Sequence, residues 1–332
     1  DSVLYFQWRK SRGSSEKFHG AVVDHDNSSE NRVFKEVSEV GSALNNLQDI
    51  KGSMKESKVA IIYDWDNDWA LKDAQGFGLE SKRYPQTLQE HYKYFWNKNI
   101  SVDVVTPSAD LSKYKLVVAP MIYLMTEETI KNFKSYVKDG GNLVGSYLSG
   151  LVNENDLTYL GGWHKDLKDI YGIEVKELDT LYPKDRNSIE FNNKKFEVKD
   201  YCSIIDLLGA KSLAEYKDDF YKETPAITKN ILDNGKAYFI GARTNQDFLS
   251  EFYDSIVNDL DLIETNDFES PKGVSIQIRE NETNKYYFVM NFTEENQDVI
   301  INNLYEDLLT NEKVLGSRVL KPYEVLVLRK SK

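Results

Sequence analysis

The alternation of hydrophobic and polar positions changes character twice along the chain. In the first part, residues 2–6 have the pattern of a short buried strand, and a polar loop separates them from an amphipathic helix. The apolar face of that helix is formed by Val33, Phe34, Val37, Val40, Leu44 and Leu47. One strand and one helix cannot bury their own apolar faces. We therefore expect residues 1–55 to be the last strand–helix unit of a larger domain together with a linker, which begins in "KGSMKES".

In the second part, short apolar strands alternate with helices. The strands have the sequences "KVAIIYD", "SVDVVTP", "YKLVVAP" and "NLVGSYLSG", and helices are predicted near 84–98 and 126–139. Strand–helix alternation with β-branched runs predicts an α/β domain built on an open parallel sheet of the flavodoxin or class I glutamine amidotransferase type. We expect this domain to span 56–268, with a long insertion from residue 157 onward.

The helix near 126–139 has the clearest boundaries in the sequence. Thr126 is the residue type that caps a helix amino terminus, and glutamates follow it in the first turn. Gly140-Gly141 then provides the stop.

In the third part, strands follow one another without helices. The segments "VSIQIRE", "KYYFVMNF", "QDVIIN" and "EVLVLRK" are separated by turn residues. Residues 269–332 are therefore predicted to form a small antiparallel β-sandwich or barrel.

Composition and charge exclude several classes of protein. The 332 residues carry 42 Lys and Arg against 54 Asp and Glu, a net charge of -12 that disfavours nucleic acid and anionic lipid as partners. The single cysteine, Cys202, permits neither an intramolecular disulfide nor a multi-thiolate zinc site, and it suits a cytoplasmic protein in which this thiol is buried. No apolar run reaches the roughly eighteen residues of a membrane span.

An acidic stretch, "YDWDNDWAL", follows the first strand of the second part. Its acids alternate as in a calcium loop, but the positions that need glycine and glutamate hold Trp69 and Gln75, so a calcium site is not expected. The stretch leaves the carboxyl end of a strand, where open α/β sheets bind ligands or partners, and Trp65 and Trp69 suit an interface. Solvated loop acids beside tryptophans that only pack explain the pattern equally well. The acids are Asp64, Asp66 and Asp68.

The bend in "GNLVGSYLSG" lies where an amidotransferase-type fold carries its nucleophile. That chemistry needs a thiol or an activated hydroxyl with a histidine in reach, but Cys202 is far downstream and the bend offers only Ser146, Tyr147 and Ser149. We expect a catalytically silent version of the fold; the competing hypothesis is a hydrolase that uses Ser149. The first loop also lacks a phosphate cradle, and "VVDHDN" around His25 suits a polar loop better than a metal site, so no cofactor or metal is expected.

The stretch "YFQWRKSRGSSEKFH" concentrates aromatic and charged residues behind the first strand. Trp8 and Arg9 can stack on or hydrogen-bond to a polar ligand, and Glu16 and His19 can accept from and donate to hydroxyl groups. An aromatic platform with charged hydrogen-bonding groups suits a sugar ring. A structural cluster of ion pairs explains the same composition equally well.

These motifs, taken in order, resemble glycoside hydrolase family 42 β-galactosidases. "LYFQWR" followed by "SSEKFHGAVVDH" is similar to the end of the family's catalytic (β/α)₈ barrel. "KVAIIYDWDNDWAL", "YKLVVAPMIYLM" and "GGNLVGSYLSGLVNENDLTYLGGWHKDLKDIYGIEVKELD" look like its amidotransferase-like trimerisation domain, and the last 60 residues look like its small β-domain. The resemblance covers effectively the whole chain.

The resemblance implies a carboxyl-terminal portion of a retaining β-galactosidase, assembled as a homotrimer and acting on terminal β-D-galactosides. The family's galactose subsite residues fall on Phe6, Glu16 and His19. Retention needs two carboxyl groups about 5 Å apart, and in the family both come from earlier barrel strands. We therefore expect no catalytic residue in this chain and no activity of the chain alone. The alternative is a free-standing module for assembly.

Overall fold

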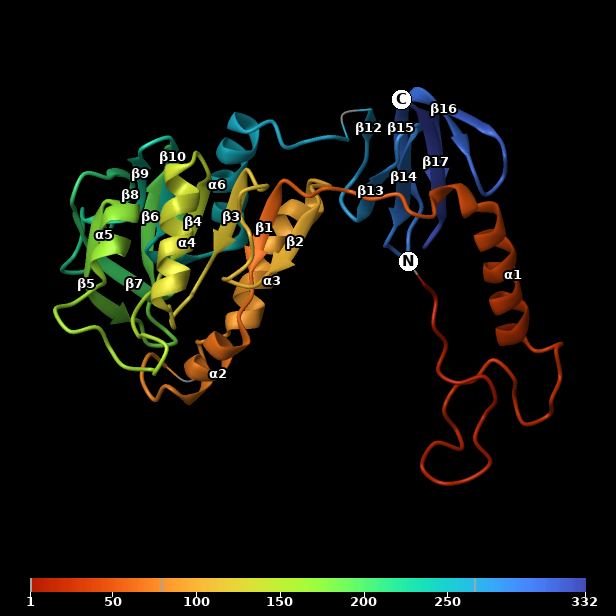
Figure 1. The fold of residues 1–332 in the computed structure, drawn as a ribbon, viewed down its shortest axis with the longest axis horizontal. Helices are drawn as coiled ribbons and strands as arrows, with labels where there is room; N and C mark the ends of the chain where they lie inside the picture. Colours follow the sequence, from red (N-terminus) through yellow and green to blue (C-terminus); the bar gives the residue numbers. More distant parts are fainter. Residues whose placement is uncertain (1, 79, 266) are drawn as a thin grey trace. The chain divides into compact units, whose positions relative to one another are not determined.

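The structure, a computed structural model, describes residues 2–78, 80–265 and 267–332. The chain divides into two compact units (Figure 1). The central unit is Glu56–Glu264, and the terminal unit combines the residues up to Lys55 with Thr265–Lys332. Within the described residues, no helix has the length and apolar character needed to span a bilayer.

Five parallel strands form one half of the central unit's sheet, in the order β2-β1-β3-β4-β10. Strands β1 and β3 are buried along their whole length, as expected for parallel strands covered on both faces. Their bounds are β1 Val59–Ile62, β2 Val102–Val105, β3 Leu116–Ala119, β4 Asn142–Ser146 and β10 Gly235–Ile240.

Helices connect and cover these strands. They are α2 Trp65–Asp73, α3 Tyr84–Asn97, α4 Glu127–Lys138, α5 Lys165–Tyr171 and α6 Gln246–Asp259. Helix α4 confirms its predicted boundaries: the Thr126 side chain accepts a hydrogen bond from the backbone N–H of Thr129, and the chain turns at Gly140 with φ 108°. In Figure 1, α4 crosses in front of the strands. Helix α3 packs on α6, and α4 packs on α5.

The other half of the sheet is antiparallel, so the prediction of an open parallel sheet is correct only for the first half. Strand β10 pairs parallel with β4 on one side and antiparallel with β9 on the other. The reason lies in the connections: β6 and β7 are joined by Asn192 and Asn193, both with positive φ, the backbone that a tight hairpin requires. The six strands of this sheet extension are β5 Ile173–Thr180, β6 Asn187–Phe191, β7 Lys194–Leu207, β8 Lys211–Tyr216, β9 Pro225–Leu232 and β11 Ala242–Thr244.

The terminal unit contains an antiparallel sheet, which confirms the predicted class of its strands. The described strands form one six-stranded sheet in the order β12-β15-β17-β14-β13, with β16 paired to β15. Its core contains Ile276, Val289 and Leu328. The strands are β12 Phe268–Glu269, β13 Val274–Glu280, β14 Asn284–Asn291, β15 Gln297–Asp307, β16 Lys313–Leu320 and β17 Val325–Ser331.

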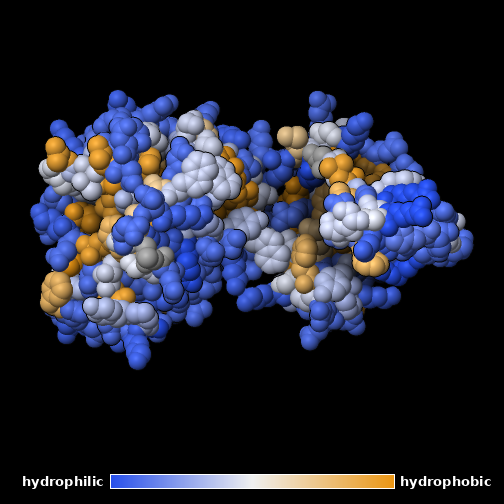
Figure 2. Space-filling view, turned by 90° about the horizontal axis from the view of Figure 1, so that it is seen from below, coloured by the Kyte–Doolittle hydropathy of each residue, from blue (hydrophilic) through white to orange (hydrophobic). Residues whose placement is uncertain are grey.

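The remainder of the terminal unit differs from the sequence prediction. The predicted helix forms as α1 Arg32–Asn46, followed by the short 3₁₀ helix η1 Gln48–Ile50, but no residue of α1 is buried. Residues 2–6 are not a strand and are exposed, because within the described chain they have no partner strand to complete their backbone hydrogen bonds. On the face shown in Figure 2, hydrophilic residues dominate and apolar patches interrupt them in both units.

Candidate functional site

The predicted sugar-binding residues lie on an exposed loop before α1. The side chain of Phe6 is 72% exposed, and Glu16 and His19 are also exposed. The recorded contact within this set is a backbone bond, in which the N–H of His19 donates to the carbonyl oxygen of Glu16 at 2.9 Å. In this chain, the three residues are therefore presented on one loop but do not enclose a pocket.

Backbone hydrogen bonds close the base of this loop. The N–H of Val23 donates to the Trp8 carbonyl oxygen (2.8 Å), and the N–H of Lys10 donates to the Val23 carbonyl oxygen (3.0 Å). The Lys10 ammonium lies 2.9 Å from the Asp24 carboxylate and holds the pKa of that carboxyl below its usual value through this hydrogen bond. The indole of Trp8 packs edge-on against the ring of Phe34, with ring centroids 6.3 Å apart, and this contact connects the loop to α1.

The acidic stretch after β1 is a helix and not the predicted loop. Asp64 caps α2 by accepting from the Asp66 N–H, and burial raises the pKa of the Asp64 carboxyl. The buried Asp68 carboxylate binds Lys72 at 2.6 Å. The acids thus support the helix and its first turn. In the part of the chain that the structure describes, no group of three or more His, Cys, Asp or Glu could hold a metal ion.

Helix α2 is also bonded to the segment that follows β3. The fully buried side chain of Asn67 donates to the Met121 carbonyl oxygen and accepts from the Leu124 N–H, both at 3.0 Å. On its opposite side, α2 exposes Trp65 and Trp69, each 60% exposed, with ring centroids 6.3 Å apart. We call these two side chains the aromatic face of α2.

The bend after β4 has the strained backbone of a nucleophile elbow but not its chemistry. Its tip is Leu148, which has φ 58° and is buried. The Ser146 hydroxyl accepts from the N–H of Met121 (2.9 Å) and donates to the Tyr147 carbonyl oxygen (3.2 Å), so it stabilises the backbone. The Ser149 carbonyl oxygen accepts from the Trp163 indole N–H (2.9 Å), and the Ser149 side chain is buried.

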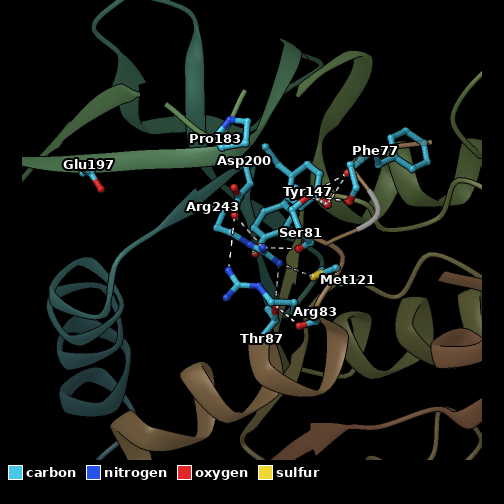
Figure 3. Close-up of polar contacts among 12 residues, drawn as sticks. Phe77, Ser81, Arg83, Thr87, Met121, Tyr147, Pro183, Glu197, Asp200 and Arg243 are labelled. Atoms are coloured by element: carbon cyan, nitrogen blue, oxygen red, sulfur yellow. Dashed lines mark hydrogen bonds and ion pairs between the residues drawn. The ribbon is translucent and has the colours of Figure 1, made fainter. Parts of the chain in front are cut away.

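A buried arginine at this edge of the sheet was missed by the sequence analysis. Arg243, on β11, is 2% exposed. Figure 3 shows its polar contacts. Its Nε donates to the Tyr147 hydroxyl at 2.9 Å, and its guanidinium carbon lies 5.0 Å from the centroid of the Tyr201 ring. The remaining donors reach the Ser81 carbonyl oxygen, the Asp200 carboxylate at 3.0 Å and the Thr87 hydroxyl at 2.9 Å.

This arrangement keeps the Arg243 charge stable inside the protein. Burial opposes the charged form, but the interactions with Tyr147 and Asp200 outweigh it and raise the pKa of Arg243. Asp200 has φ 61° within the long strand β7, a backbone that aspartate tolerates better than most residues. Because the donors are used within the chain, this cluster joins the sheet extension to the loop before α3. A lone arginine in "FIGARTN" gives no periodic signal that could reveal it.

Cys202, His91 and His164 have structural surroundings. Cys202 is buried as predicted, and burial raises the pKa of its thiol to about 12. His91 is buried on α3, where its Nδ1 lies 2.6 Å from the Tyr253 hydroxyl. His164 caps α5 and contacts Glu127 at 3.1 Å.

Models of known protein families match three consecutive stretches of the chain. Residues 57–263 match the family model described as the β-galactosidase trimerisation domain. The chain belongs to glycoside hydrolase family 42. Residues 273–330 match the family's β-galactosidase C-terminal domain, and residues 1–47 match its β-galactosidase model. The resemblance inferred from the motifs is therefore confirmed.

Relatives within family 42 match along nearly the whole chain. β-Galactosidase GalA of Bacillus licheniformis is 51% identical over 332 residues, covering 100% of this chain and 49% of the relative. β-Galactosidase GanA of Bacillus subtilis is 52% identical over 327 residues, covering 98% of this chain and 49% of the relative. The chain spans about half the length of the curated relatives that it matches.

Solved family 42 structures share the fold of this chain. Gan42B, a β-galactosidase from G. stearothermophilus, superposes with a TM-score of 0.97 at 51% identity, covering 99% of this chain and 48% of that chain. A β-galactosidase from Bacillus circulans sp. alkalophilus superposes with a TM-score of 0.93 at 33% identity, covering 99% of this chain and 49% of that chain.

Proposed function

We propose that these 332 residues are the carboxyl-terminal half of a retaining β-galactosidase that hydrolyses terminal β-D-galactosides. The observation that carries the proposal is the match to three consecutive family 42 models in their order along the chain. Coverage of about half of relatives named β-galactosidases supports the same division.

In this proposal, the chain contributes to galactose binding but not to bond cleavage. Phe6 supplies an apolar ring, and Glu16 and His19 supply hydrogen bonds to sugar hydroxyls. Their exposure on one loop supports this role, because an exposed loop is free to complete a pocket built from other barrel loops. Retention needs two carboxyl groups about 5 Å apart, and we assign neither of them to this chain.

Reconstitution tests the proposed function. The 332-residue protein alone should not hydrolyse a chromogenic β-galactoside, whereas mixing it with the amino-terminal half of the Bacillus licheniformis relative should restore turnover. In the mixture, Glu16→Gln and His19→Ala should each reduce kcat/KM at least tenfold, whereas Glu30→Gln, on the same exposed segment, should not.

Two outcomes would contradict the proposal. Turnover by the purified chain alone would mean that it contains its own catalytic residues. A mixture that assembles but remains inactive, with an active full-length relative as control, would favour the free-standing assembly module instead.

We also propose that the central unit is a flavodoxin-type, amidotransferase-like domain that assembles the protein as a homotrimer. The order of its parallel strands, β2-β1-β3-β4-β10, supports the flavodoxin type because that fold has the strand order 2-1-3-4-5. The description of the matching family model supports the trimer. The aromatic face of α2 is our candidate for part of the subunit interface, since tryptophan is enriched among the residues that contribute most to binding at interfaces.

We further propose that the protein resides in the cytoplasm. The chain has one cysteine, and it is buried and free, so the fold needs no oxidising compartment. Fractionation of cells that produce the native protein, followed by detection with an antibody, tests this proposal.

A further inference from the structure

The segment between two family matches is anchored along its length. The β-galactosidase match ends at residue 47 and the trimerisation match begins at residue 57, which suggests a flexible connection. In the structure, however, Leu47 and Ile50 pack against a small core on the terminal unit's sheet. That core consists of Tyr286, Leu308 and Val327. We call residues 47–54 the junction segment.

A buried tyrosine holds the middle of the junction segment. The Tyr286 hydroxyl donates to the Asp49 carbonyl oxygen at 2.8 Å and accepts from the Asn281 side-chain amide at 3.1 Å. Tyr286 is fully buried, so its hydroxyl depends on these partners. Arg329 reinforces the contact by binding the Asp49 carboxylate and the Glu306 carboxylate, each at 2.7 Å.

The end of the junction segment pairs with the edge of the sheet. The N–H of Met54 donates to the Glu280 carbonyl oxygen (2.8 Å), and the N–H of Glu280 donates to the Met54 carbonyl oxygen (2.7 Å). The Arg279 guanidinium donates to the hydroxyl (3.2 Å) and the carbonyl oxygen (2.5 Å) of the buried Ser53. The edge strand β13 thereby gains a backbone partner at this point.

Apolar packing, a buried hydroxyl, side-chain hydrogen bonds and backbone pairing thus hold five positions of the eight-residue junction segment: Leu47, Asp49, Ile50, Ser53 and Met54. A flexible linker would make none of these contacts. The contacts come from the three strands β13, β14 and β17, with Glu306 of β15 behind them, so the sheet presents a continuous binding surface.

We propose that the carboxyl-terminal sheet binds the junction segment and fixes its position. We call this set of contacts the clasp. By fixing residues 47–54, the clasp fixes the end of α1, and α1 in turn holds the loop that carries Glu16 and His19 through the contact between Trp8 and Phe34. The clasp itself rests only on the contacts described above. Its consequence for galactose binding rests on the proposed function.

Hydrogen exchange and limited proteolysis of the 332-residue chain test the clasp. The test variant combines Tyr286→Phe with Arg279→Gln, which removes two anchors and keeps side-chain size. We expect the Met54 amide to exchange at least tenfold faster, and trypsin to cleave after Lys51 and Lys55 at least tenfold faster. The β1 amides of the central unit serve as an internal reference and should not change.

The matched control combines Tyr305→Phe with Arg318→Gln. Tyr305 is a buried tyrosine of the same sheet whose hydroxyl donates to Asp267 at 2.8 Å. Among the residues that the structure describes, neither Tyr305 nor Arg318 bonds to the junction segment, so exchange at Met54 should stay within twofold of the unaltered protein. Unchanged exchange in the test variant, or equal acceleration in the control, would overturn the clasp.

Reconstituted activity then separates this inference from the proposed function. If both are right, the test variant in the active mixture should raise KM for the galactoside at least threefold and lower kcat less than twofold, because the substrate loop loses its position while the catalytic carboxyl groups lie elsewhere. An unchanged KM despite faster exchange would overturn the positioning role. Inactive mixtures of the unaltered protein would overturn the proposed function and leave the exchange result to decide the clasp.

Discussion

Asp200 and Arg243 form an ion pair whose two halves come from distant parts of the sequence. The Arg243 guanidinium is almost fully enclosed, so the loss of the Asp200 charge leaves a buried cation whose hydrogen bonds to Tyr147, Ser81 and Thr87 remain but whose ion pair with Asp200 is gone. The Asp200 side chain keeps some contact with solvent, which reduces the expected cost below that of a fully enclosed pair.

We predict that Asp200→Asn lowers the free energy of unfolding of the central unit by about 2 kcal/mol. Asparagine tolerates the left-handed backbone at this position, so the change reports on charge and not on strain. Asp219→Asn is the control, since Asp219 is exposed and also has a positive φ of 74°. Urea unfolding followed by circular dichroism measures both; equal effects of the two substitutions would contradict the prediction.

His91 makes the stability of the central unit depend on pH. Burial, with a smaller contribution from Arg243, lowers the pKa of His91 to about 3 from its ordinary 6.5. The unfolded chain therefore binds a proton between these values that the folded chain does not. The stability contributed by neutral His91 is complete above pH 6.5 and is lost progressively as pH falls toward 3.

We predict that this single group costs about 3 kcal/mol of stability between pH 7 and pH 4.5. His91→Gln should lower the number of protons taken up on unfolding by about one over that range, which reduces the slope of the unfolding free energy against pH. Tyr253→Phe, which removes the hydroxyl partner but keeps the buried imidazole, should preserve the slope. Unfolding free energies measured across the range decide between these results, and an unaltered slope in His91→Gln would refute the assignment.

At the scale of elements, the sequence was informative where a local signal and the final packing agree. Helix α4 has an N-cap, an apolar face and a glycine stop, so its boundaries followed directly. Helix α2 has no comparable apolar periodicity, and only its cap at Asp64 and its first-turn acids indicate a helix. Residues 2–6 have a strand pattern, but a strand also needs a neighbour, which no local pattern supplies.

The cap of α4 can be tested by a single substitution. Thr126→Ala should lower the free energy of unfolding by about 1 kcal/mol, because the Thr129 N–H loses its acceptor at the amino terminus of the helix. Ser135→Ala, on an exposed position within the same helix, should change it by less than about 0.5 kcal/mol. Thermal unfolding measures both, and a Thr126→Ala effect no larger than that of Ser135→Ala would exclude the cap as a significant contribution.

The candidate site shows the same division between local and long-range information. Phe6, Glu16 and His19 could be selected from motifs, and the loop that joins them is evident in the sequence. The Arg243 cluster could not, because its partners Ser81, Thr87, Tyr147 and Asp200 are brought together only by the folded sheet. The anchoring of the junction segment was hidden for the same reason, since "KGSMKES" has the composition of a linker.

For the whole molecule, the homotrimer that we propose would, with cyclic symmetry, require two different surfaces that meet in each contact. We predict that replacing both Trp65 and Trp69 by alanine weakens self-association at least a hundredfold, since each buried interface tryptophan contributes about 2 kcal/mol or more. Light scattering over a range of concentrations measures the change. Tyr323→Ala, an exposed aromatic of the terminal unit, is the control. If the double variant self-associates as strongly as the unaltered protein, α2 is not part of the interface.

The change of direction at β10 has a consequence for the order in which the central unit folds. The chain leaves β4 at Ser146 and returns beside it only at Gly235, so this parallel pairing closes a very long loop, whereas β6 with β7 and β9 with β10 meet through short turns. Loop closure costs entropy before any contact compensates for it, so hairpins gain structure sooner than distant parallel pairs. We expect the hairpins of the sheet extension to form early and to deliver β10 to β4 in the rate-limiting step. Substitutions that disrupt the turn at Asn192 and Asn193 should therefore slow refolding, although they lie far in the sequence from the strands that the slow step joins.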